Sequence, residues 1–150
     1  SLILIRIIPR YFVYKYITKI IKVSQKNFGN WNPGDTDKGD QAQDATTPAI
    51  KVRNDPISSV NIKADVKGTD FTGPEALSIS QVTYDDDNSP SQGTETNMAE
   101  TAMAVTYPGT NYYTGITPGS TADFWFFIDI PSGQDAGAYT STFTFKGTGA

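Results

Sequence analysis

The sequence contains no cysteine and no histidine. Without cysteine the chain has no disulfide bonds, no thiol nucleophile and no thiolate metal site. Without histidine it has no Ser-His-Asp or Cys-His arrangement, no histidine metal site and no side chain whose unperturbed pKa lies near neutrality. We therefore expect no enzymatic activity, no catalytic residue and no cofactor.

The sequence also lacks a long uninterrupted apolar run. Its most apolar stretch, residues 1–26, is interrupted by Arg6, Pro9, Arg10 and Lys15. A membrane-spanning helix needs about 20 mostly apolar residues, and each charge near its centre costs about 2.5–3.5 kcal/mol. A signal peptide would place its charges first and small residues after an apolar core. We expect neither a membrane span nor a signal peptide here.

Charge divides the chain at residue 26. Residues 1–26 hold six basic residues and no acid, about +6, whereas residues 27–150 hold six basic and all sixteen acidic residues, about −10. Such an asymmetry is typical of a segment with a partner of its own. We therefore predict an N-terminal strand segment, residues 1–26, that precedes a body of residues 27–150.

The start of this segment, Leu2–Ile8, is apolar at odd and even positions alike, apart from Arg6. A strand with two apolar faces must be covered on both, and left free it would form an aggregation-prone edge. It is therefore either an ordinary strand of its own domain or a strand donated to a neighbouring molecule. The candidate interface side chains are Leu2, Ile3, Leu4, Ile5, Ile7 and Ile8.

The body is rich in turn formers and aromatic residues, with 13 Gly, nine Pro, eight Tyr and eight Phe. Short alternating apolar patterns predict several strands and no long helix. The predicted strands cover 49–53, 59–66, 76–84 with a break between Ile79 and Val82, 101–107, 122–130 and 138–146. The last two are predicted to form a long hairpin. With the N-terminal segment and the break in 76–84 counted, the chain has roughly seven to nine strands, which favours an all-β, antiparallel sandwich of the Ig-like or jelly-roll type.

Three stretches carry a resemblance: NFGNWNPGDT at 27–36, KVRNDPISSVNIKADVKGTDF at 51–71, and ITPGSTADFWFFIDIPSGQDAGAYTSTFTF at 116–145. Together they resemble secreted β-sandwich filament subunits of archaea, the bundling-pilus and thread proteins. These are similar in plan to the bacterial TasA and camelysin fibre proteins. The resemblance covers about residues 27–147 and consists mostly of turn and strand motifs.

The resemblance implies an extracellular, cell-surface homopolymer. In donor-strand filaments the N-terminal strand of one subunit fills a groove in the next, and the head-to-tail contact does not close. Leu2–Ile8 would be the donor strand, and the partners would be other copies of the chain, with other filaments or cell-surface glycans as further partners. Alternatives are a monomeric cell-surface adhesion or binding module, and a virion coat protein.

Acidic and aromatic residues of the body are further candidates for binding sites. Asp85, Asp86 and Asp87 offer oxygen ligands for calcium but lack the spacing of an EF-hand, so a solvated acidic loop is the favoured interpretation. The acids at 35, 37 and 40 are interpreted in the same way. Trp31 and the pair Tyr112 and Tyr113 are candidates for sugar binding, although Trp31 and Trp125 more often fill a core or pack between subunits. The basic N-terminus is rich in aliphatic residues, so we expect burial and no nucleic-acid binding.

Overall fold

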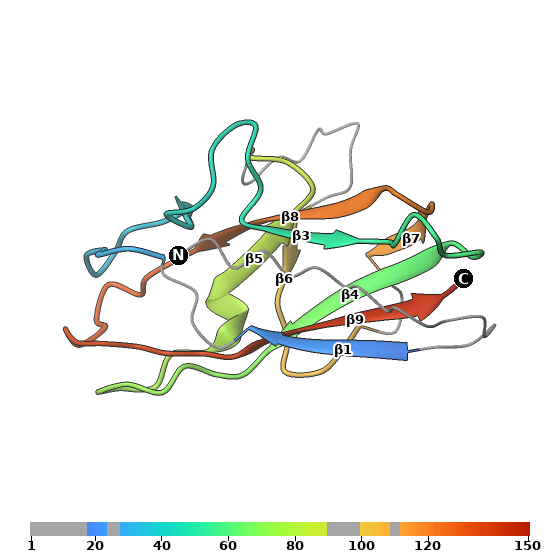
Figure 1. Ribbon diagram of the computed structural model, residues 1–150. Helices are drawn as coiled ribbons and strands as arrows, with labels where there is room; N and C mark the ends of the chain where they lie inside the picture. The colour runs from blue at the N-terminus through green and yellow to red at the C-terminus, as the bar shows by residue number, and fades with distance from the viewer. Residues whose placement is uncertain (1–17, 24–27, 90–99, 109–111) are drawn as a thin grey trace.

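The computed structural model describes residues 18–23, 28–89, 100–108 and 112–150, and its strands form two antiparallel sheets (Figure 1). The first sheet has the order β1-β9-β4-β7. Its strands are β1 (Thr18–Val23), β9 (Phe143–Gly149), β4 (Ile62–Gly68) and β7 (Tyr113–Ile116). The long central strands β4 and β9 pair along their whole length, from Ile62 opposite Gly149 to Gly68 opposite Phe143.

The second sheet is built around β8 (Thr121–Ile128). On one side β8 pairs with β5 (Val82–Asp85), which in turn pairs with β6 (Thr101–Ala102). On its other side β8 pairs with two short strands, β2 (Lys38–Gly39) and β3 (Ile50–Arg53). A single 3-10 turn, η1 (Ile79–Gln81), precedes β5.

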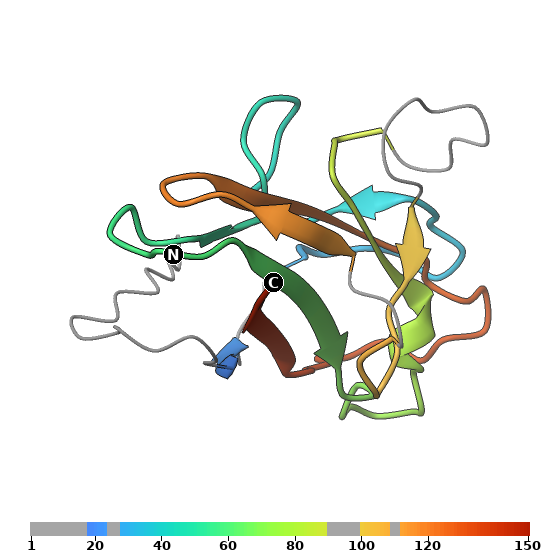
Figure 2. The ribbon, with the colours of Figure 1, turned by 90° about the vertical axis from the view of Figure 1, so that its right-hand side faces the viewer.

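The two sheets stack face to face, with the layer of β8 above that of β9 in Figure 2. Aromatic rings meet between the layers: Phe124 of β8 lies 5.3 Å from Phe145 of β9, and Phe126 lies 5.1 Å from Phe143, measured between ring centroids. Every buried side chain of the described core belongs to residues 28–145. The predicted all-β antiparallel sandwich is confirmed.

The alternation patterns of the strands were largely right. Ile50 and Val52 are buried and Lys51 and Arg53 are exposed, as their two-residue period predicts. The predicted break before Val82 is the 3-10 turn η1. The strand predicted over 101–107 is too long, because only Thr101–Ala102 forms a strand.

The predicted C-terminal hairpin is wrong. β8 and β9 lie in different sheets, so the chain between Ile128 and Phe143 crosses from one layer to the other. Within this crossover Thr72 and Thr140 form a bridge, which ties the connection to the loop after β4. β9 then pairs with β4 and β1, which makes it the centre of the first sheet.

Candidate functional site

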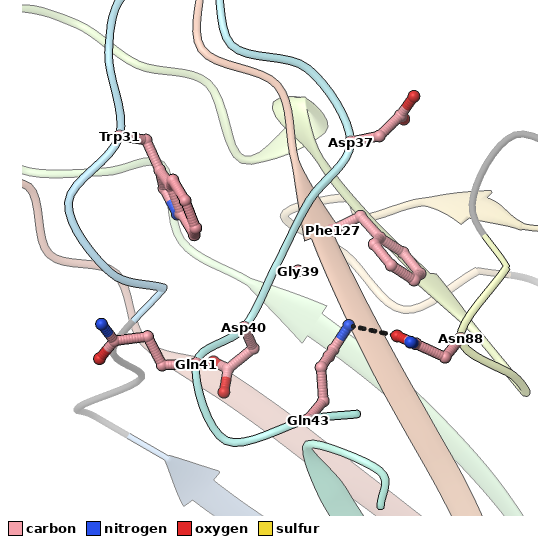
Figure 3. Close-up of a pocket in the computed structure, with 8 residues that line it drawn as sticks. All are labelled: Trp31, Asp37, Gly39, Asp40, Gln41, Gln43, Asn88 and Phe127. Carbon is pink, nitrogen blue, oxygen red and sulfur yellow. Dashed lines mark hydrogen bonds between the residues drawn. The ribbon is translucent and has the colours of Figure 1, made fainter. Parts of the chain in front are cut away.

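An open hollow of about 380 Å³ lies beside β2, on the outside of the second sheet. We call it the Trp31 hollow. Figure 3 shows Trp31 and Gln41 on one side of the β2 backbone and Phe127, Gln43 and Asn88 on the other. The full lining is Trp31, Asp37, Gly39, Asp40, Gln41, Gln43, Asn88 and Phe127. The lining thus combines one exposed indole with a group of amides and carboxylates on both sides of β2.

The turn that leads into β2 is fixed by unusual backbone geometry. Asp37 has a φ of 52°, which non-glycine residues rarely adopt, and its N–H donates to the Asp129 carboxylate at 2.8 Å. Such conformations cost free energy and are found disproportionately at functional sites. Directly after this turn, Lys38 and Gly39 pair with Ile128 and Phe127 of β8, which anchors the rim of the hollow on a core strand.

The amide of Gln43 is held at both ends. Its Oε1 accepts from the Phe126 N–H at 2.9 Å, and its Nε2 donates to Asn88 Oδ1 at 3.2 Å. A Cβ at Gly39 would come within 2.9 Å of Gln43 Nε2, so glycine at this position leaves room for the amide. The polar wall of the hollow is therefore preorganised.

The two tryptophans occupy different environments. Trp125 is 7% exposed and its indole N–H donates to the Asp44 carbonyl at 2.8 Å, in agreement with the core-filling interpretation. Trp31 is 38% exposed, with the Lys38 ammonium 5.7 Å from the centre of its ring. Trp31 is thus the tryptophan that a ligand can reach.

Tyr112 and Tyr113, also considered for sugar binding, pack against the core instead. Both contact Phe124, with ring centroids 6.2 and 5.2 Å away, and the Tyr113 hydroxyl donates to the Asp123 carbonyl. Burial, reinforced by nearby carboxylates, raises the pKa of both phenols well above its usual value. Both tyrosines are thus half-buried against the core and less accessible to a ligand than Trp31.

Two of the acidic residues predicted to lie in solvated loops, Asp40 and Asp85, are buried. Asp85 is buried at the end of β5, where its Oδ1 accepts from the Asp86 N–H at 2.7 Å and from the Tyr112 hydroxyl at 3.3 Å. Asp87 caps its own turn by accepting from the Ser89 N–H. Asp40 is also buried, and its Oδ1 accepts from the Ala42 N–H. Among the described residues, no three acidic side chains are placed to hold a metal ion.

A second polar cluster lies on the outer face of the first sheet. Asp65 of β4, directly opposite Lys146 of β9, is 1% exposed, and its Oδ2 has no hydrogen-bond partner. Desolvation raises the pKa of Asp65, against the opposing effects of the Val66 N–H and Lys146. The Tyr107 ring lies over this face, 4.3 Å from Lys146 Nζ and 5.0 Å from Lys67 Nζ.

The predicted interface residues Leu2, Ile3, Leu4, Ile5, Ile7 and Ile8 lie outside the described residues. The structure does place β1, the later part of the same N-terminal segment, at the margin of the first sheet. Within the described part of the chain, β1 pairs with β9 alone, from Thr18 opposite Thr148 to Val23 opposite Phe143.

No protein-family model matches the chain, and no curated protein or solved structure is significantly similar to it. The resemblance to archaeal filament subunits therefore stays a prediction. Among the described residues, no helix is long and apolar enough to cross a membrane.

The amides of the Trp31 hollow were missed by sequence reasoning. Gln41, Gln43 and Asn88 are common polar residues in loop-like sequence, and no local pattern marks them as a group. Gln43 and Asn88 are brought together only by the pairing of the sheet. The one signal available was the indole of Trp31 between turn-forming residues.

Proposed function

We propose that this chain is a structural subunit of an extracellular, cell-surface filament. In this proposal the strand Leu2–Ile8 of one subunit adds to the sandwich of the next. The observation that carries the proposal is the position of β1, because this edge strand directly follows the N-terminal residues and, among the described strands, has a partner on one side only.

The edge of β1 that has no partner among the described strands suits a strand of the proposed kind. β1 is six residues long and Leu2–Ile8 is seven, so a donor strand of about 23 Å would follow the whole edge. Strand addition supplies a ladder of main-chain hydrogen bonds, and alternate side chains provide specificity. Each Leu or Ile side chain that becomes buried contributes about 1.5–3 kcal/mol.

The body has a packed core, whose described residues run from Phe28 to Phe145. The acidic body, about −10, also attracts the basic segment of a neighbour, about +6. Because a donor and an acceptor edge are different surfaces, the contact repeats without closing and makes a fibre.

The alternative of a monomeric adhesion module differs in one respect. There Leu2–Ile8 would pair within its own subunit, and the protein would stay monomeric at every concentration. A virion coat protein would assemble together with a nucleic acid, as a closed shell or a helical tube. The two alternatives thus predict different assemblies from the same sandwich.

A peptide competition experiment tests strand donation. Excess synthetic peptide of residues 1–10 is added to full-length subunits, and filament length is followed by light scattering and electron microscopy. We expect the peptide to occupy acceptor edges and shorten the filaments, because it carries the donor strand without a body. A matched peptide with Ile3, Ile5 and Ile7 replaced by Ser should have no effect. Equal inhibition by both peptides, or by neither, would contradict donation by this strand.

A further inference from the structure

We propose that the Trp31 hollow binds a neutral sugar ring. The proposal goes beyond filament assembly and stands on different residues. The hollow of about 380 Å³ falls within the range of about 300–1,000 Å³ that is typical of small-ligand sites. Such sites combine an apolar or aromatic surface with a few fixed polar groups, and this hollow has both.

The aromatic surface is Trp31. A pyranose ring has one face of C–H groups, which packs against an indole, and a rim of hydroxyls, which need hydrogen-bond partners. Trp31 leaves 38% of its surface exposed, whereas a large apolar side chain in a core is mostly buried. Its ring points into the hollow, towards the β2 backbone (Figure 3).

The hydroxyl partners are amides held in place before a ligand arrives. Gln43 uses Oε1 for the Phe126 N–H and one Nε2 hydrogen for Asn88, which leaves its second Nε2 hydrogen to donate. The Asn88 amide nitrogen carries two further hydrogens. Because these groups are already oriented, binding loses little side-chain entropy.

The carboxylates define the class of sugar. Asp37 and Asp40 border the same hollow; Asp40 is buried, so Asp37 is the carboxylate that can accept a hydrogen bond from a ligand hydroxyl. Both carboxylates also repel an anionic ligand, so uronic-acid and sialic-acid glycans are disfavoured. The left-handed backbone of Asp37 fixes the rim at this point, and Gly39 keeps the floor open for the Gln43 amide. Neutral hexose or N-acetylhexosamine chains fit this arrangement.

The test uses the full-length chain and defined oligosaccharides. Isothermal titration calorimetry and tryptophan fluorescence are measured with cellohexaose, maltohexaose, mannohexaose and chitohexaose, and with hexagalacturonate as the acidic counterpart. We expect at least one neutral hexasaccharide to bind with a Kd below about 1 mM and to change the Trp31 emission. Hexagalacturonate should bind more weakly.

Variants locate the site. Trp31→Ala should weaken binding at least about tenfold, and Asn88→Ala should weaken it independently. Ile57→Ala, which removes an apolar side chain that is 74% exposed elsewhere on the surface, should leave the Kd unchanged. Circular dichroism checks that each variant keeps the sandwich. The proposal is overturned if no neutral hexasaccharide binds up to about 10 mM, if folded Trp31→Ala binds as tightly as the parent chain, or if the acidic glycan binds best.

Discussion

Replacement of Asp65 by Asn should stabilise the sandwich at neutral pH. The carboxylate is 1% exposed and its Oδ2 has no hydrogen-bond partner, while Oδ1 accepts from the Val66 N–H at 2.8 Å. Asn keeps an oxygen for that bond and removes the charge. Burial, together with the Asp65 charge, raises the pKa of the Tyr107 phenol, so the neutral amide also removes an unfavourable interaction with that ring.

The expected magnitude follows from the cost of burying the charge on the unpartnered oxygen. A buried polar atom without a partner costs about 1–3 kcal/mol and more when it is charged, so Asn lowers this cost by removing the charge, while the lost attraction to Lys146 offsets part of the gain. We therefore expect Asp65→Asn to raise the free energy of unfolding by about 1 kcal/mol at pH 7. For a chain of this size, this corresponds to a rise in Tm of about 2–4 °C.

The gain should depend on pH. Because desolvation raises the pKa of Asp65 above 3.8 in the folded state, the folded chain holds this proton more tightly than the unfolded chain. The resulting stability is fully present below pH 3.8 and is lost as the pH rises through the folded pKa. The advantage of the neutral Asn should therefore be small near pH 3 and complete at pH 7.

Urea unfolding followed by circular dichroism between pH 3 and pH 8 measures this effect. Both forms are compared without residues 1–10, so that assembly does not add to the measured stability. Lys146→Ala should destabilise the Asp65 form and have little effect in the Asn form, a double-mutant cycle that isolates the pair. A loss of stability in Asp65→Asn at pH 7 would refute the reasoning, since attraction to Lys146 would then outweigh desolvation.

Two further substitutions test the packing of the sandwich by the same unfolding assay. Asn54→Ala should cost about 2–3 kcal/mol, because the buried Asn54 amide donates to the Val60 and Ile116 carbonyls, both at 2.9 Å; a cost below 0.5 kcal/mol would show that water replaces it. Gly68→Ala should cost about 1–3 kcal/mol, because the added Cβ would lie 2.6 Å from Ile79 Cδ1; unchanged stability would mean that the core yields freely.

The strands could be predicted because their signal is local. The alternation of Ile50 and Val52, or of Phe124 and Phe126, records which face meets the core, and the structure buries these residues. The pairing of strands within a sheet could not be predicted in this way. The pattern of Phe143 and Phe145 is the same whether their strand pairs with β8 or with β4, so the predicted hairpin had no local feature to correct it.

The burial of acids and the Trp31 hollow depend on contacts between distant segments. Alternation correctly assigned Asp65 to the face opposite Val66. The residue that covers this face, Tyr107, lies 42 positions further along the chain. In the same way, Gln43 and Asn88 meet only because β2 and β5 both pair with β8. A local pattern predicts which face of a strand a side chain lies on, and it does not predict which distant residues cover that face.

The most direct measurement of the proposed function is electron microscopy beside size-exclusion chromatography, on the full-length chain and on a deletion of residues 1–10. Strand donation requires filaments of the full-length chain, and it requires the deleted form to elute as a folded monomer that makes none. A full-length chain that is monodisperse and monomeric at every concentration would contradict the filament, as would a deleted form that still polymerises.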